Sequence, residues 1–242
     1  MNLTNEQFNI LKDRKDISFI TFTNYGYIHY TKNLILSLEK CNFPLLLKIY
    51  CIDQKSFDEL QKFKKNILLE MLNDETNTNE NIIGWKGEGW NTMAFSKLKC
   101  IHKELLINPY VFYTDSDIVF EKDCLPYLIE NLKDYDMLIQ KNRKDYINQF
   151  CTGFMFIRSN KIMINLFDWR KINLESFVAD ADYINENKSK LKIKGLKRKY
   201  FPSQRYYCVE HKNISPFIIH FNRYNGLKKE KYMRNLKKWY LD

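Results

Sequence analysis

Two aspartates separated by one serine follow an apolar run in the segment VFYTDSDIVF. Asp115 and Asp117 come directly after residues 108–114, whose composition is typical of a short buried strand. Carboxylates this close together repel each other and lose hydration, and a hard divalent cation offsets both costs. Strand ends are also where α/β sheets bind ligands. The pair therefore indicates a metal site, although for an isolated Asp-x-Asp a turn cap beside a solvated acid is the ordinary alternative.

A second group of polar residues lies near the C-terminus, in IIHFNRYNGLKK. His220 closes an apolar strand, Gly226 permits close backbone approach, and Lys228 and Lys229 begin a helix. An imidazole ligand, a glycine that admits phosphate and a neutralising lysine would form a pyrophosphate subsite at a helix N-terminus. A histidine at a strand end is more often a satisfied structural group. The two segments therefore support a functional site only together.

Alternating strand and helix patterns surround these two segments. Strands are expected at residues 17–23, 45–53, 108–114, 135–140, 152–158 and 215–222, and helices at 28–39, 56–72, 91–107 and 125–132, from residue 160 and at the C-terminus. Ser56 is the expected N-cap of the helix over 56–72. This order predicts an α/β fold with a mixed, mainly parallel central sheet flanked by helices. We expect one domain over residues 1–242, with a Rossmann-like nucleotide-binding half at about 17–120 and a second half at about 121–242.

Composition limits the partners and the compartment. The 242 residues carry a formal net charge of +10, which favours an anionic partner, and much of it lies in 188–198 and near the C-terminus. The basic stretch and the polar stretch 73–90 are candidates for acceptor recognition or donor closure, or are solvated surface. Six scattered cysteines indicate neither a zinc site nor a disulfide framework. Without an apolar leader or membrane span, we expect a cytoplasmic protein, in the host cytoplasm if it is viral.

The order of these motifs resembles a known family. A first strand, the DSD motif, the strand TGFMFIR, the segment DADYIN and a terminal H-x-N-x-x-x-G-x-K are similar to GT-A fold nucleotide-diphospho-sugar transferases. The likeness is closest to the glycogenin and bacterial galactosyltransferase type and to related plant and viral transferases. It extends from Ile17 to Lys229. The DSD and the terminal motif are specific as a pair and weak separately.

The resemblance implies a role for each matching residue. Asp115, Asp117 and His220 would bind Mn²⁺, with Mg²⁺ as the alternative, and two carboxylates with an imidazole suit Mn²⁺. Asp180 and Asp182 would lie near the transferred sugar as the catalytic pair. The positions implied to contact the UDP-sugar donor are Thr21, Thr23, Asn24, Tyr25, Asp53, Lys97, Asp115, Ser116, Gly153, Asn222, Gly226, Lys228 and Lys229. Several have ordinary explanations too: Thr23 and Asn24 form turns, Asp53 begins a helix, and Lys97 is a surface lysine.

Two positions depart from the family pattern. Cys151 stands where the family often has asparagine beside the donor sugar, which puts that contact in doubt. Ala181 stands where the family has glutamine near the anomeric carbon. Because that amide would assist a double displacement, its loss makes such a route less attractive and leaves Asp182 as the best candidate to bind sugar hydroxyls.

The predicted reaction is metal-dependent transfer of a sugar from a UDP-sugar to a hydroxyl of a glycan, protein or lipid acceptor. The assigned residues serve the leaving group, and the sequence names no general base, which agrees with retention of configuration. One alternative is a metal-dependent nucleotidyl or phosphoryl transferase, weakened by the absence of a phosphate-binding G-x-x-x-x-G-K-[ST] loop. Another is a basic noncatalytic nucleic-acid-binding protein. We expect no nucleic-acid partner, and a homodimer remains open.

Overall fold

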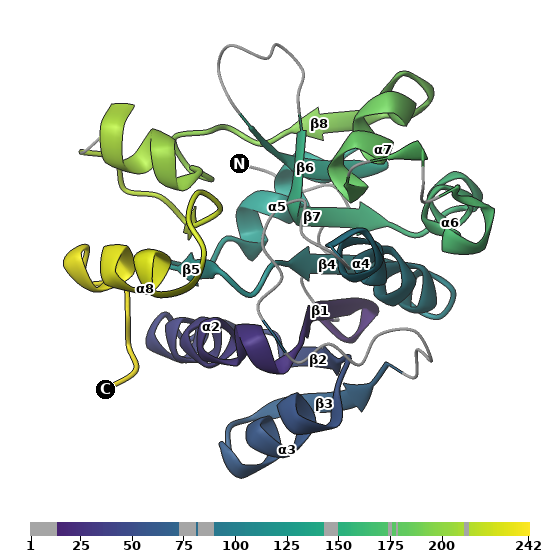
Figure 1. Cartoon of the computed structure of the whole chain (residues 1–242). Coiled ribbons are helices and arrows are strands. Elements are labelled where there is room, and N and C mark those ends of the chain that lie inside the picture. The colour runs from purple at the N-terminus through teal and green to yellow at the C-terminus, as the bar shows by residue number, and fades with distance from the viewer. Residues whose placement is uncertain are drawn as a thin grey trace.

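Seven strands form the central sheet of the computed structural model, which describes residues 14–72, 81, 90–142, 150–173, 176–177, 179–210 and 213–242 (Figure 1). Their order across the sheet is β3-β2-β1-β4-β7-β6-β8. The strand β7 runs antiparallel to both of its neighbours, and the other pairings are parallel. The predicted mixed, mainly parallel sheet is therefore confirmed. The strands are β1 (Ile17–Thr23), β2 (Leu47–Cys51), β3 (Ile67–Met71), β4 (Tyr110–Thr114), β6 (Met137–Lys141), β7 (Phe150–Arg158) and β8 (Ile193–Gly195).

Helices cover both faces of this sheet. Side chains alternate between the faces along each strand, so that Phe19 of β1 joins one hydrophobic core and Ile20 joins the other. Helices α2 (Ile28–Lys40), α3 (Gln54–Lys62) and α5 (Leu125–Leu132) contribute to the first core. Helices α4 (Trp90–Leu105), α6 (Lys161–Phe167) and α7 (Asp180–Asn187) contribute to the second. A sheet buried on both faces accounts for the nearly continuous apolar sequence of strands such as β4.

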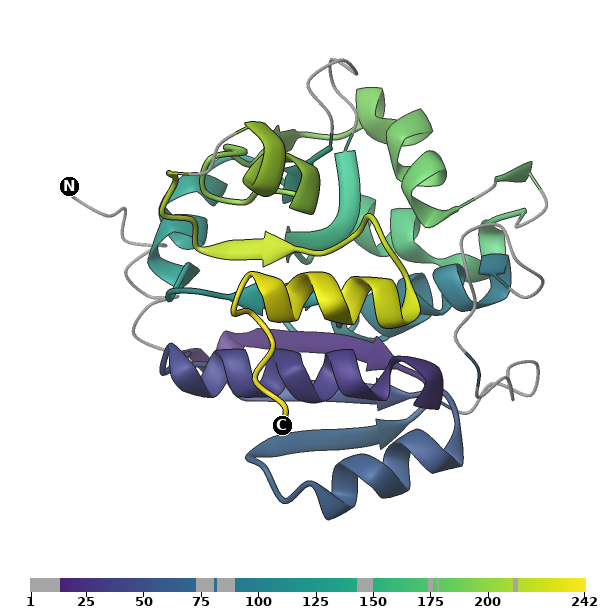
Figure 2. The same ribbon diagram turned by 60° about the vertical axis from the view of Figure 1, so that its left-hand side comes forward.

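A second, two-stranded sheet joins distant parts of the chain. In it, β5 (Ile118–Phe120) pairs antiparallel with β9 (Ile218–His220), and Ile118 lies opposite His220. The helix α8 (Gly226–Asn235) follows and lies alongside α2 (Figure 2). The amide of Asn33 on α2 binds the backbone of the final segment, since it donates to Lys238 O at 3.1 Å and accepts from Tyr240 N at 2.6 Å. Because β5 follows β4 closely in the chain, its pairing with β9 holds His220 close to the end of β4.

Two sequence expectations are wrong in detail. The predicted helix over 56–72 is a helix at Gln54–Lys62 followed by the strand β3, because residues 67–71 pair with β2 in parallel register and Lys64 turns the chain at a φ of 50°. Its N-cap is Asp53 rather than Ser56, since the Asp53 carboxylate accepts from Ser56 N at 2.7 Å. The basic stretch 188–198, a candidate for acceptor recognition, contains the short strand β8.

Among the described residues, no helix has the length and apolar character that crossing a membrane requires. The polar stretch 73–90, a candidate for acceptor recognition, falls outside the described residues except at positions 81 and 90.

Candidate active site

A cleft of about 680 Å³ opens at the carboxyl ends of β1 and β4. The antiparallel strand β7 starts at the same edge, and α4, α7 and the segment after β9 complete the walls. The cleft therefore lies where open α/β sheets bind ligands. It is lined by twelve of the predicted site residues: Thr23, Asn24, Lys97, Asp115, Ser116, Asp117, Gly153, Asp180, Asp182, His220, Asn222 and Lys229.

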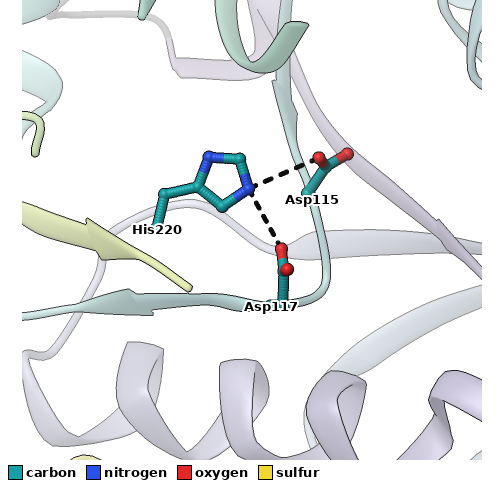
Figure 3. Close-up of side chains that lie close together, drawn as sticks. All are labelled: Asp115, Asp117 and His220. Carbon is teal, nitrogen blue, oxygen red and sulfur yellow. Dashed lines mark ion pairs between the residues drawn. The ribbon is translucent and has the colours of Figure 1, made fainter. Parts of the chain in front are cut away.

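The three predicted metal ligands meet in this cleft. Asp115, Asp117 and His220 each offer one ligand atom, and these atoms all lie within 4.8 Å of one another. Figure 3 shows Nε2 of His220 facing both carboxylates, at 3.6 Å from Asp115 Oδ2 and 3.1 Å from Asp117 Oδ1. The pairing of β5 with β9 produces this approach, because Phe221 N donates to Asp117 O at 3.0 Å.

Each of the three side chains is held through its other polar atom. Asp115 Oδ1 accepts from Tyr113 OH at 2.6 Å and lies 3.1 Å from Lys97 Nζ. Asp117 Oδ2 accepts from Lys229 Nζ at 2.5 Å. Nδ1 of His220 lies 2.7 Å from Oε1 of Gln140. The remaining atoms, Oδ2, Oδ1 and Nε2, therefore turn toward a common centre.

The charges around this centre shift the pKa of two of its members. Burial raises the pKa of Asp117, but Lys229 and His220 outweigh it and hold that pKa well below its usual range. Burial lowers the pKa of His220, and the neighbouring Asp117 outweighs that effect and raises it to about 10. Protonated His220 and Lys229 thus balance the acids, and a metal ion would displace the His220 proton.

The residues fit a divalent cation. Two carboxylate oxygens and one imidazole nitrogen are a donor set that suits Mn²⁺. The second polar atom of each ligand is already bound by a neighbouring residue, as metal ligands in proteins usually are.

An irregularity in β7 brings Gly153 onto the metal-ligand cluster. The register of β6 with β7 shifts between Ile139 and Gln140, which pair with Met155 and Cys151 respectively. The intervening residues bulge, and the carbonyl of Gly153 accepts from Asp115 N at 2.7 Å. A Cβ at Gly153 would lie 2.2 Å from His220 Cε1 and 2.6 Å from Asp115 Oδ2. Only glycine fits there.

Lys97 connects the metal-ligand cluster to α7. Its Nζ lies 3.1 Å from Asp115 Oδ1 and 3.0 Å from Asp180 Oδ2, and the side chain is almost fully buried. Burial lowers the pKa of Lys97, but Asp115 and Asp180 raise it more, so the ammonium stays charged. The surface-lysine alternative is therefore wrong. On the same helix as Asp180, Asp182 is exposed at the cleft wall, and Asn185 binds both backbone groups of Phe150.

The two C-terminal lysines are in different environments. Lys229 is 3% exposed and bound to Asp117, whereas Lys228 is exposed and lies over the ring of Tyr224. Gly226 begins α8 at a φ of 54°, which favours glycine. Neither Gly226 nor Lys228 lines the cleft. Lys229 is thus the lysine of the pair that reaches the acids.

The predicted nucleoside-binding residues divide into two sets. Thr23 and Asn24 line the cleft, and Asn24 also caps a 3₁₀ turn by accepting from Tyr27 N at 3.1 Å. Thr21 is buried, and Tyr25 and Asp53 lie outside the cleft lining. The two oxygens of Asp53 accept from Tyr25 N at 2.8 Å and Ser56 N at 2.7 Å. A contact between Asp53 and uracil stays a prediction, beside the helix-capping role that the structure gives it.

Several residues at the cleft were not predicted as site residues. Tyr27, Arg205 and Arg223 also line it, and Gln140 and Tyr113 support it from behind. Arg205 lies in a short helical segment that continues through Tyr206–Glu210, and Arg223 lies in the turn before α8. Neither segment has an apolar period that predicts its place in the fold. Tyr113 was readable, because a residue two before Asp115 on a strand shares its face.

The sheet order, the cleft and the paired acids at the end of β4 define a glycosyltransferase fold of the GT-A type. A family model for nucleotide-diphospho-sugar transferases matches residues 47–233, most of the chain. The chain therefore belongs to the nucleotide-diphospho-sugar transferase family, and the family resemblance seen in the sequence is confirmed. No curated protein matches the chain in sequence.

Solved glycosyltransferase structures share the fold. The glycosyltransferase GlyE of Streptococcus pneumoniae is 18% identical with a TM-score of 0.59, over 93% of this chain and 60% of that one. The galactosyltransferase LgtC, solved with donor and acceptor sugar analogues, is 10% identical with a TM-score of 0.51, over 93% and 97%. A glycosyltransferase involved in glycosylating the major capsid of PBCV-1 is 11% identical with a TM-score of 0.52, over 90% and 98%. This chain thus spans about 60% of the length of GlyE.

Proposed function

We propose that this protein transfers a sugar from a UDP-sugar to an acceptor hydroxyl, with Mn²⁺ bound and with retention of the anomeric configuration. The observation that carries the proposal is the convergence of Asp115 Oδ2, Asp117 Oδ1 and His220 Nε2. The other polar atom of each of these side chains is bound by a neighbouring residue. Membership of the nucleotide-diphospho-sugar transferase family supports the donor class. Mn²⁺ held there would neutralise the donor's diphosphate and stabilise it as a leaving group.

The chain's own cations serve the same leaving group. Lys229 and Lys97 lie in the cleft beside Asp117 and Asp115, and both are buried. We assign them to the oxygens of the departing diphosphate, whose negative charge grows as the bond to the sugar breaks. Since both ammonium groups are held by carboxylates before the donor binds, they need little reorganisation during the reaction.

Retention is supported by the state of the acids in the cleft. Of the carboxylates among the described cleft residues, Asp115, Asp117 and Asp180 are in ion pairs, and only Asp182 makes none. We assign Asp182 to sugar hydroxyls. The acceptor hydroxyl then attacks C1 on the face from which UDP leaves: the acceptor oxygen bonds to C1, the phosphate–C1 bond breaks, and the departing phosphate oxygen takes the acceptor proton.

Donor hydrolysis tests this function without a known acceptor. The protein is incubated with a panel of nucleotide sugars and Mn²⁺, and release of UDP is followed before and after EDTA. We expect one UDP-sugar to be cleaved, loss of cleavage with EDTA, and at least a ~100-fold decrease in Asp115→Asn and Asp117→Asn variants that unfold at the wild-type temperature. Metal-independent release, or no release from any donor, would contradict the proposal. NMR of the anomeric proton in the first product then separates retention from inversion.

A further inference from the structure

Gln140, near the end of β6, is fully buried and bonded at both ends of its side-chain amide. Its Oε1 lies 2.7 Å from Nδ1 of His220, and its Nε2 donates to the carbonyl of Phe201 at 3.1 Å. The side chain thus spans from a packed backbone segment to the histidine of the metal-ligand cluster.

The carbonyl of Phe201 fixes which way the amide faces. A carbonyl only accepts hydrogen bonds, so the NH₂ end of Gln140 must face Phe201 and the oxygen must face His220. The oxygen in turn accepts only from a protonated Nδ1. When the imidazole is neutral, its lone pair is therefore on Nε2, the atom that faces Asp117 and Asp115.

The surroundings hold this amide in place. The ring of Phe201 is fully buried and packs against Phe154 and Phe217 with centroid distances of 5.3 Å and 5.6 Å, which anchors its carbonyl. The register shift between Ile139 and Gln140 interrupts the regular pairing at that point, and such bulges redirect side chains. The nearest other partner of His220 Nδ1, Cys151 Sγ at 3.8 Å, is a weak one.

We propose that Gln140 is a positioning residue that holds the His220 ring with Nδ1 as a hydrogen-bond donor and presents Nε2 to the metal. This inference rests on the proposed metal-dependent function. Without the Gln140 amide, the ring of His220 is free to turn about its side-chain bonds and to carry its proton on Nε2. Either change removes the nitrogen ligand from the centre while Asp115 and Asp117 remain.

Mn²⁺ binding to three variants of the full chain tests this role. Binding is titrated by EPR, and ¹⁵N-labelled histidine reports direct ligation through its hyperfine coupling to the ion. We expect Gln140→Met, which keeps the chain length and loses the oxygen, to weaken Mn²⁺ binding by ~10–100-fold and to lose the coupling. Gln140→Glu still accepts the Nδ1 proton and should keep the coupling, with affinity within a few-fold of wild type. In the His220→Ala background, Gln140→Met should change nothing further.

Thermal unfolding of each variant shows whether the fold is kept, and Gln140→Asn, whose amide cannot span both partners, replaces the methionine variant if that one unfolds. A folded Gln140→Met variant with wild-type affinity and coupling would overturn the positioning role. Equal weakening in Gln140→Glu and Gln140→Met would overturn it too, because it would indicate packing alone. If the wild type binds no Mn²⁺, the metal-dependent function itself fails; wild-type binding that Gln140→Met leaves unchanged contradicts only the role of Gln140.

Discussion

The backbone of Gly153 packs against the imidazole ring of His220 so closely that no side chain fits between them. A Cβ on residue 153 would lie 2.2 Å from Cε1 of the ring and 2.6 Å from Oδ2 of Asp115, well inside van der Waals contact. The ring is buried and its Nδ1 is bound to Gln140, so it cannot move aside without losing that bond. Position 153 therefore requires glycine, because any side chain would overlap His220 and Asp115.

We therefore expect Gly153→Ala to disrupt the metal-ligand cluster. The added methyl group should displace His220 or Asp115, reduce Mn²⁺-dependent donor hydrolysis by ~100-fold or more and lower the free energy of unfolding by about 1–3 kcal/mol. Gly195→Ala is the matched control, because the three atoms nearest to its Cβ all belong to the flexible side chain of Lys141, which can move away. Initial rates and urea denaturation measure both effects. A wild-type rate of donor hydrolysis in Gly153→Ala would show that this close approach is not needed for activity.

Lys229 and Lys228 provide a second comparison within one helix. Lys229 is buried against Asp117 and Lys228 is exposed, so only the first can reach a diphosphate held at the acids. We expect Lys229→Ala to lower donor hydrolysis by on the order of 100-fold and Lys228→Ala to lower it by less than about threefold. Mn²⁺ affinity should not fall in Lys229→Ala, since a competing positive charge is removed. Equal effects of the two substitutions on hydrolysis would refute the assignment.

The bridge from Lys97 to Asp115 and Asp180 leads to a third prediction. Lys97→Met keeps the length of the side chain but leaves two acids without their common cation. We expect a loss of about 3 kcal/mol in the free energy of unfolding and a decrease of ~100-fold in donor hydrolysis. Lys99→Met on the same helix is the control, because Lys99 packs over Trp169 on the other side. Calorimetry and initial rates give the two quantities, and the prediction fails if both variants behave alike.

Much of the fold followed from local patterns in the sequence. The helix at 125–132 has the predicted bounds, and the strands around Phe19 and Phe112 appear where apolar runs predict them. The run ILLEM was misassigned to a helix, because its place is set by pairing with β2 and a short apolar run has no clear period. The sequence also showed which acids and which histidine to consider, because each lies at the end of an apolar strand.

The geometry that makes these residues a site depends on contacts between distant segments. His220 reaches Asp117 through the pairing of β5 with β9, which no local pattern encodes. The sequence does not identify Gln140 as a site residue, because glutamine is common near strand ends. Its role depends on hydrogen bonds to both His220 and Phe201, which are distant in the sequence. The choice between Lys228 and Lys229 depends on which side of α8 faces the acids. The sequence does not determine this orientation, so it leaves both lysines as candidates.

Glu104, which does not line the cleft, supports the fold and gives a prediction about pH. Its buried carboxylate accepts from Ser18 Oγ at 2.6 Å, Lys48 Nζ at 2.7 Å and Tyr50 OH. Burial raises the pKa of Glu104, but the hydrogen bonds from Lys48, Ser18 and Tyr50 outweigh it, so the pKa is lower in the folded than in the unfolded protein. This stabilisation is present above the unfolded pKa of about 4.3 and is lost as the pH falls through the folded pKa.

We therefore expect Glu104→Gln to lower the free energy of unfolding at pH 7 by about 1–3 kcal/mol, because Ser18, Lys48 and Tyr50 lose their charged acceptor, while Lys48 keeps its pair with Glu70. The difference from wild type should shrink steadily below pH 4, where the wild-type carboxylate also becomes neutral. Glu59→Gln is the control: Lys32 and Lys62 also lower the pKa of Glu59, but that carboxylate is partly exposed to solvent, so its unfolding should differ from wild type much less than that of Glu104→Gln at every pH. Urea titrations between pH 3 and pH 8 measure the differences. A constant difference across that range would mean that the packing of Glu104, and not its charge, stabilises the fold.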